Sequence, residues 1–182
     1  VVLKNNLLGL DIKIDGHYLK TQVWGFFNVY NLLAICAVSI RIHPNKEDVL
    51  NGLVNLKNVL GRFNLIKVGD GINVIIDYAH SPGAIQSVFD SVLKLKSINQ
   101  SIITIVGCGG NRDKGKRPEM GRVSYQNSDI VIFTADNPRD ENINDIISDM
   151  VYNLKEESQK KLFQIGNRRE AIQKSIELAK RN

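Results

Sequence analysis

Residues 101–118 read SIITIVGCGGNRDKGKRP, and the chain changes there from apolar to glycine-rich and basic. The first part, residues 101–106, is a nearly continuous apolar run, which is typical of a parallel strand covered on both faces. A basic loop follows, and a helix is predicted from about Pro118. The alternation continues with strands at residues 130–134 and 162–165, a helix at 143–154 and a last helix from 167 onward. Because such alternation requires parallel crossovers, the sequence predicts an α/β fold with a Rossmann-like parallel sheet.

Three polar loops follow predicted strands. Two more strands are predicted upstream, at residues 65–68 and 74–77, and Pro82 opens a helix after them. Ligands bind at the carboxyl ends of the strands in sheets of this kind. We therefore expect the loops that follow the strands to lie at one edge of one sheet and to form a site; they are residues 77–80, 107–117 and 136–139.

The first 60 residues follow another pattern. Apolar and polar residues alternate on both sides of Gly16, which predicts two short strands between residues 10 and 24. Helices are predicted at residues 29–42, ended by Pro44, and at 46–56. These elements do not make a complete α/β layer. We therefore expect residues 1–60 to be the end of one domain, and residues 61–182 to be a second domain truncated before its last strands.

Composition excludes several classes of protein. With 182 residues, 43% apolar and 24% charged, the chain is typical of a globular protein rather than a disordered tail. A net charge of +5 slightly favours anionic ligands but is too small for a dedicated nucleic-acid binder. No apolar run reaches the roughly 18 residues that cross a bilayer, and the first residues do not resemble a signal peptide. Cys36 and Cys108, the only cysteines, favour a reducing compartment and argue against a disulfide framework or structural zinc.

The loop after residue 106 is the first candidate for chemistry. It carries four cations and one acid up to Pro118; the cations are Arg112, Lys114, Lys116 and Arg117. Glycines let backbone N–H groups approach an anion, and arginine offers a planar pair of donors to a carboxylate or phosphate. The loop has neither the Walker spacing nor a dinucleotide fingerprint. It predicts an anion site, and a solvated basic turn is the alternative.

Two further segments contain candidate site residues. In the loop Asp136-Asn137-Pro138-Arg139, the proline fixes the backbone, and we expect Arg139 to project towards the ends of the strands. Asn-Pro turns are common, so this tetrapeptide alone is weak support for a site. His80 starts a loop before a helix, where a lone histidine is more often structural than functional.

Five motifs, taken in order, resemble the Mur ligase family. They are GFFNVYNLLA (25–34), GRF (61–63), DYAHSP (77–82), GCGGNRDKGKRP (107–118) and DNPR (136–139). The resemblance runs from about Leu19 to Asn182, nearly the whole chain, and is closest to the members that add diaminopimelate in peptidoglycan synthesis. Ser81 stands where the family usually has threonine, and Asn111 where aspartate is common.

This resemblance implies a bacterial cytoplasmic enzyme that uses ATP and Mg²⁺. The γ-carboxylate of UDP-MurNAc-L-Ala-D-Glu would become an acyl phosphate, and the amine of meso-diaminopimelate would attack it. The tetrahedral intermediate would collapse to an amide and phosphate. Preorganised donors stabilise phosphoryl groups and oxyanions, which suits a positively charged site. The family further implies a monomer with no nucleic-acid or membrane partner.

Roles for individual residues are implied by the same motifs. ATP would be bound by Asn28 and Asn31 on the adenine side, and by Arg62 and Asp77 at the ribose and phosphates. His80 would be catalytic, beside the reacting groups. Meso-diaminopimelate would be held by Arg112 and by the loop Asp136, Asn137, Pro138 and Arg139. Within that loop, Arg139 would clamp the distal carboxylate, which lysine lacks.

The domain assignment follows from the same resemblance. It implies that residues 1–60 end the central ATPase domain and that residues 61–182 are most of the C-terminal domain. The sequence contains no phosphate-binding Gly-Lys-Thr loop. The resemblance implies that three further parts of the enzyme lie outside this sequence. They are the magnesium-binding residues, the lysine expected to be carbamylated and the domain that holds the UDP substrate. We therefore expect the chain alone to be inactive.

Two alternatives stay open. The chain could be a stand-alone Rossmann-like module that binds an amino acid or an anion without converting it. It could also be part of a folylpolyglutamate-type ligase, which shares the architecture and the ATP-dependent amide chemistry. The segments 107–110 and 136–139 argue against the folate ligase.

Overall fold

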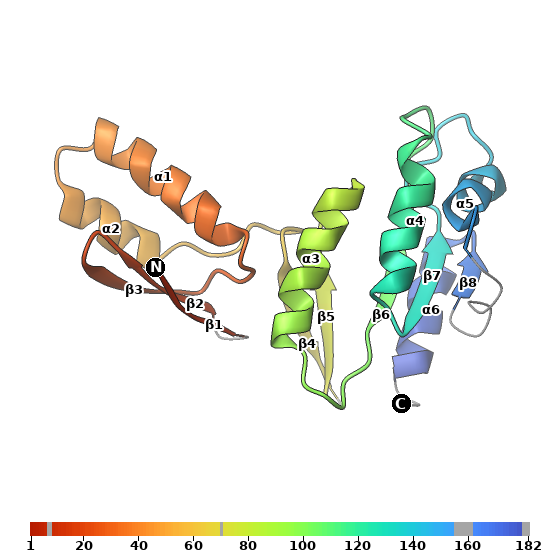
Figure 1. Ribbon diagram of the computed structural model, residues 1–182, viewed down its shortest axis with the longest axis horizontal. Helices are drawn as coiled ribbons and strands as arrows, with labels where there is room; N and C mark the ends of the chain where they lie inside the picture. The colour runs from red at the N-terminus through yellow and green to blue at the C-terminus, as the bar shows by residue number, and fades with distance from the viewer. Residues whose placement is uncertain (7–8, 70, 155–161, 180–182) are drawn as a thin grey trace. The chain divides into compact units, whose positions relative to one another are not determined.

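A computed structural model describes residues 1–6, 9–69, 71–154 and 162–179 of the chain (Figure 1). The chain forms two compact units, each described here by itself. Unit 1 comprises residues 1–68, 73–78 and 87–96, and unit 2 comprises residues 69–72, 79–86 and 97–182. None of the described helices has both the length and the apolar character needed to span a membrane.

Unit 1 begins with a three-stranded antiparallel sheet in the order β1 (Val2–Asn6), β2 (Gly9–Ile14), β3 (His17–Thr21). The predicted strand pair around Gly16 is confirmed as β2 and β3. Gly16 has a φ of 86°, in the left-handed region that a tight turn between strands needs and that glycine adopts without strain. Strand β1 was not predicted, because three consecutive polar residues, Lys4, Asn5 and Asn6, interrupt its apolar pattern.

Two helices complete the first core of unit 1. Helices α1 (Asn28–Ile42) and α2 (Lys46–Val54) pack on each other, and α2 also packs on β3. Both were predicted; α2 ends two residues early, and Asn45 caps its start by accepting the N–H of Glu47. Sheet and helices bury one apolar cluster, made of Leu10, Ile12, Leu19, Leu32, Cys36, Leu50 and Leu53.

The next elements are divided between the two units. Strands β4 (Asn64–Val68) and β5 (Ile72–Ile76) form a separate two-stranded sheet, and α3 (Pro82–Leu95) begins at the predicted proline. The expectation that all three polar loops follow strands of one sheet is therefore wrong for the first loop. Within the described residues, β5 pairs with β4 and not with the parallel sheet.

Unit 2 contains the predicted parallel sheet, in the order β6 (Ile103–Val106), β7 (Ile130–Thr134), β8 (Leu162–Ile165). The central strand is apolar throughout its middle, and Val131, Ile132 and Phe133 are fully buried. Helices α4 (Lys116–Gln126) and α5 (Ile143–Val151) pack on each other and on β7. Helix α6 (Arg168–Ala179) packs across all three strands, and the Rossmann-like α/β arrangement is confirmed (Figure 1).

The ends of the helices in unit 2 follow local chemistry. Helix α4 starts two residues before Pro118, because proline is tolerated in the first turn, where no helical partner exists for its missing N–H. The last helix begins directly after the predicted start, residue 167, where the side chain of Asn167 accepts the N–H groups of Arg169 and Glu170. This helix buries Ala171, whereas Ile172 and Ile176 are exposed.

Candidate functional site

The loops that follow β6 and β7 lie against each other at the carboxyl ends of these strands. The N–H of Gly110 donates to the carbonyl oxygen of Asn137 at 2.8 Å. A Cβ added at Gly110 would lie 1.8 Å from the carbonyl oxygen of Pro138, and one added at Gly107 would lie 2.5 Å from that of Thr134. Glycine is therefore required at both positions because two backbones meet there.

Arg139 is anchored to the glycine-rich loop. Its Nη1 donates to the carbonyl oxygen of Gly110 at 2.7 Å and, more weakly, to that of Asn137 at 3.4 Å. The side chain is exposed, and its Nε and Nη2 have no hydrogen-bond partner in the described part of the chain. These two nitrogens form the edge of the guanidinium that can bind a carboxylate bidentately.

Arg112 lies beside Arg139. A Cβ added at Gly109 would lie 3.1 Å from Nη1 of Arg139 and 3.8 Å from Cγ of Arg112, so both side chains lie close to Gly109. Arg112 is exposed, as are Asp136 and Asn137 of the facing loop. The structure thus brings both predicted substrate-binding arginines together around one glycine. Two arginine side chains that start beside one glycine at the end of a parallel sheet suit a ligand that carries carboxylates.

Arg117 forms a buried network that was not predicted from the sequence. Its side chain is fully buried, and it donates to the carboxylates of Glu141 and Asp149 and to the carbonyl oxygen of Gly109. Glu141 also accepts the N–H of Asn111. The hydrogen bonds from Arg117, and then the one from Asn111, lower the pKa of Glu141 to about 2. The sequence pattern contains Arg117, but it gives no sign of which acid pairs with it.

The loop before α3 reaches the start of α4. The Nζ of Lys116 donates to the backbone oxygen of His80 at 2.9 Å, and the side chain of His80 is exposed. Both residues belong to unit 2. His80 is therefore held next to the helix that begins directly after the glycine-rich loop.

Cys108 lies in that loop as well, but it is buried and its Sγ faces the sulfur of Met120 at 3.5 Å. Burial raises the pKa of this thiol to about 11, which suits packing rather than nucleophilic chemistry. Cys36 is buried too, and both cysteines are free thiols.

The residues predicted to bind nucleotide are linked to one another within unit 1. Asn28 is 8% exposed; its amide donates to the carbonyl oxygen of Trp24 at 2.6 Å, and its Oδ1 accepts the amide of Asn31 at 2.7 Å. The ring of Phe63 meets the neighbouring Phe27 edge-on, with centroids 5.7 Å apart.

The other two predicted nucleotide residues flank Phe63. The N–H of Phe63 donates to Oδ2 of Asp77 at 2.7 Å, and the guanidinium of Arg62 lies 4.5 Å from the ring centroid of Tyr78. Arg62 is exposed and keeps its cation on an aromatic face.

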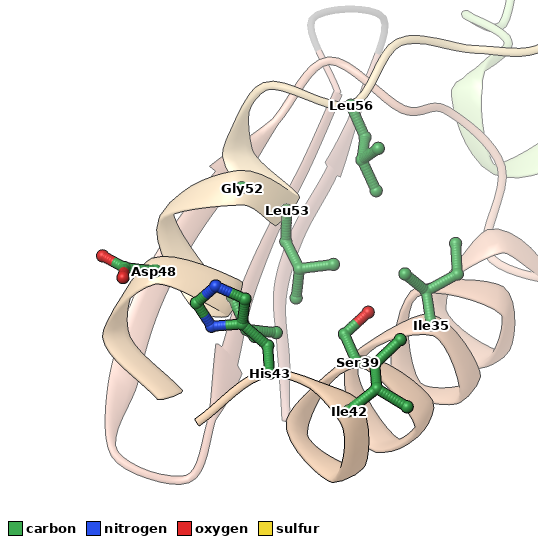
Figure 2. Close-up of a pocket in the computed structure, with 9 residues that line it drawn as sticks. Ile35, Ser39, Ile42, His43, Asp48, Gly52, Leu53 and Leu56 are labelled. Carbon is green, nitrogen blue, oxygen red and sulfur yellow. The ribbon is translucent and has the colours of Figure 1, made fainter. Parts of the chain in front are cut away.

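A shallow groove between α1 and α2 is the other candidate (Figure 2). Its walls are mainly apolar, with Ile35, Ile42, Leu53 and Leu56 facing it, and it has few polar groups to orient a ligand. No group of histidine, cysteine, aspartate or glutamate side chains that could hold a metal ion occurs among the described residues. The charged loops of unit 2 are therefore the stronger candidate for chemistry.

Comparisons with known proteins cover most of the chain. Residues 61–182 match the family model described as Mur ligase, glutamate ligase domain. A UDP-N-acetylmuramoyl-L-alanyl-D-glutamate–2,6-diaminopimelate ligase from Bacteroides fragilis is 41% identical over 180 residues, which are 99% of this chain and 37% of that protein. The chain thus spans little more than a third of the length of the curated relatives it matches.

Solved structures give the same fold. A UDP-N-acetylmuramoyl-L-alanyl-D-glutamate–2,6-diaminopimelate ligase is 29% identical with a TM-score of 0.61, covering 94% of this chain and 36% of that one. A folylpolyglutamate synthase from Thermotoga maritima has a TM-score of 0.68 and covers 95% of this chain and 40% of that one. At 21% identity, the synthase shows likeness of fold alone.

Proposed function

The chain belongs to the Mur ligase family, and from that premise we propose that it forms the amino-acid-binding part of an ATP-dependent ligase. This ligase would join 2,6-diaminopimelate to UDP-N-acetylmuramoyl-L-alanyl-D-glutamate in peptidoglycan precursor synthesis, the reaction named for its relatives. The observation that carries the proposal is the pair of arginines, Arg112 and Arg139, whose side chains both lie close to Gly109.

Arg139 has the geometry to select diaminopimelate. Its Nη1 is fixed to the backbone of the neighbouring loop, and its Nε and Nη2 edge can bind the distal carboxylate in two parallel hydrogen bonds. Lysine has an amine at that end but no carboxylate. A charge-assisted contact of this kind is typically worth about 1.5–3 kcal/mol, which is roughly a factor of 10 to 100 in the specificity constant. Asp136, Asn137 and Pro138 would complete this binding loop.

The donor set in unit 1 suits the adenosine part of ATP. Asn31 and Arg62 are exposed, whereas the amide of Asn28 is already committed to two protein partners. We therefore assign Asn28 the task of orienting Asn31, and Arg62 and Asp77 the ribose and phosphate side. When bound, ATP supplies the phosphoryl group that activates the acceptor carboxylate. His80 would lie near the reacting groups, held by Lys116 through its backbone oxygen.

The described residues do not offer a site that fits Mg²⁺, because no cluster of acidic, histidine or cysteine ligands forms among them. No residue of this chain is assigned to the metal. Of the two alternatives, the folate ligase is supported by likeness of fold alone. No observation favours a stand-alone binding module.

Steady-state kinetics of the full-length protein test the assignment, with Mg-ATP, the UDP-linked acceptor, and either meso-diaminopimelate or lysine. Arg139→Ala should lower kcat/KM for diaminopimelate at least about tenfold and leave the KM for ATP nearly unchanged. Arg139→Lys should restore little, since an ammonium group lacks the planar pair of donors. Lysine should remain a poor substrate in both variants, because removal of the Arg139 guanidinium creates no binding pocket for an amine.

Arg168 supplies a matched control. It too donates from Nη1 to a backbone carbonyl that follows β7, that of Ala135, at 3.0 Å. Arg168→Ala should therefore keep the preference for diaminopimelate. If Arg139→Ala used diaminopimelate as well as the parent, Arg139 would be a turn residue only, and the substrate assignment would lose its main support.

A further inference from the structure

The guanidinium of Arg117 is fully buried and donates hydrogen bonds to four acceptor atoms. Its Nη1 donates to Oε2 of Glu141 at 3.0 Å and to Oδ2 of Asp149 at 2.8 Å. Its Nη2 donates to Oε1 of Glu141 at 2.9 Å and to the carbonyl oxygen of Gly109 at 3.3 Å. A buried guanidinium requires such pairing, because an unpaired charge inside a protein is strongly destabilising. Since it is covered completely, Arg117 cannot itself contact a substrate.

Glu141 ties the two loops of the site together. It lies two residues after Arg139, and its carboxylate accepts hydrogen bonds or salt bridges from Asn111, Lys114 and Arg117. Asn111 and Lys114 stand on either side of Arg112 in the sequence. A second link joins the same loops, since Asn111 and Asp140 exchange two hydrogen bonds of 3.2 and 3.4 Å.

We propose that Arg117 and Glu141 are a positioning pair that sets the separation of Arg112 and Arg139, and through it the affinity and selectivity for the amino-acid substrate. The pair acts on both arginines through the backbone: Arg117 fixes the carbonyl of Gly109, which lies close to both side chains, and Glu141 fixes the amide of Asn111. The part of this inference that concerns substrate rests on the proposed function. The part that concerns the spacing of the two loops is independent of the proposed function.

Two conservative variants of the full-length protein test the pair. Arg117→Lys keeps the charge but loses the planar fork, and Glu141→Gln keeps the shape but loses the charge. Each should raise the KM for diaminopimelate about tenfold, change kcat less than about threefold and leave the KM for ATP within about twofold. The ratio of kcat/KM for diaminopimelate to that for lysine should fall about tenfold in each variant. This ratio does not depend on how much of the protein is folded, because the active fraction cancels.

Arg122→Lys is the matched control. Arg122 lies in the same helix and pairs with Glu119 at 2.6 Å, but it is exposed, so its substitution should leave the ratio unchanged. An unchanged ratio in both test variants would overturn the proposal. A fall in kcat together with a rise in the KM for every substrate would also overturn it.

Hydrogen–deuterium exchange separates this inference from the proposed function. In both test variants, amides of residues 108–115 and 137–141 should exchange at least about tenfold faster, while those of β6 and β7 keep their protection. Unchanged exchange in these loops would overturn the positioning role even in an active ligase. If the parent protein did not ligate diaminopimelate, the proposed function would fail, and faster exchange would still support the spacing role.

Discussion

Glu141 is held ionised by the donors around it, and the stability of the site should depend on pH accordingly. Its pKa falls from an ordinary 4.5 to about 2, mainly because of the hydrogen bonds from Arg117. A carboxylate whose pKa is lower in the folded state than in the unfolded state stabilises the fold above the unfolded value. That stabilisation is lost as the pH falls through the folded value.

We therefore expect the parent protein to be more stable than Glu141→Gln by a constant margin from pH 7 down to about 4.5. The margin should shrink between pH 4.5 and about 2. Thermal denaturation of both proteins across this range measures the difference. A margin that already disappeared between pH 7 and 5 would contradict the assignment of the low pKa to Glu141.

Helices α4 and α5 are in such close contact at Gly121 that one added methyl group should push them apart. A Cβ added at Gly121 would lie 1.8 Å from the carbonyl oxygen of Met150. Because the obstacle is backbone, the helices must shift, and Gly121→Ala should destabilise the protein by about 1–3 kcal/mol in urea denaturation.

Gly52 in α2 is the control for this prediction, since no atom lies within 4 Å of its added Cβ. Gly52→Ala should stabilise the protein by up to about 1 kcal/mol, because alanine has the higher helix propensity. A stabilising effect of Gly121→Ala would show that α4 and α5 are not in close contact.

At the scale of the whole molecule, the segment between α2 and β4 should be the first site of proteolysis. Val59 and Leu60 are 69% and 85% exposed and lie outside the helices and strands. Asn58, just before them, is held by the N–H of Trp24 and by the carbonyl oxygen of Phe63. Thermolysin should therefore cleave first at Val59 or Leu60, as N-terminal sequencing of the early fragments would reveal.

The double variant Val59→Asp and Leu60→Asp removes the apolar side chains that thermolysin prefers, and it should slow this cut. An equally fast first cut in that variant, or uniform resistance of the parent, would show that the segment is better protected than its exposure indicates.

The strands of the parallel sheet could be predicted from the sequence alone. Strands β7 and β8 lie at the predicted residues, and α6 begins directly after residue 167, its predicted start, where Asn167 caps it. These features follow from local signals, namely continuous apolar runs and a side chain that accepts a nearby N–H, and such signals act over a few residues. The motifs of the candidate site were visible in the sequence for the same reason, since each occupies one loop.

Which loops meet, and which side chains hold them together, could be learned only from the folded chain. Arg117 and Glu141 are 24 residues apart, and no local pattern connects them. The same applies to Gly109, which lies close to both Arg112 and Arg139, and to β5, which within the described ranges pairs with β4 and not with the parallel sheet. Periodicity and propensity describe how a segment buries its own side chains. The partner of a buried charge depends instead on which chain segments the packed sheet and helices bring within hydrogen-bonding distance.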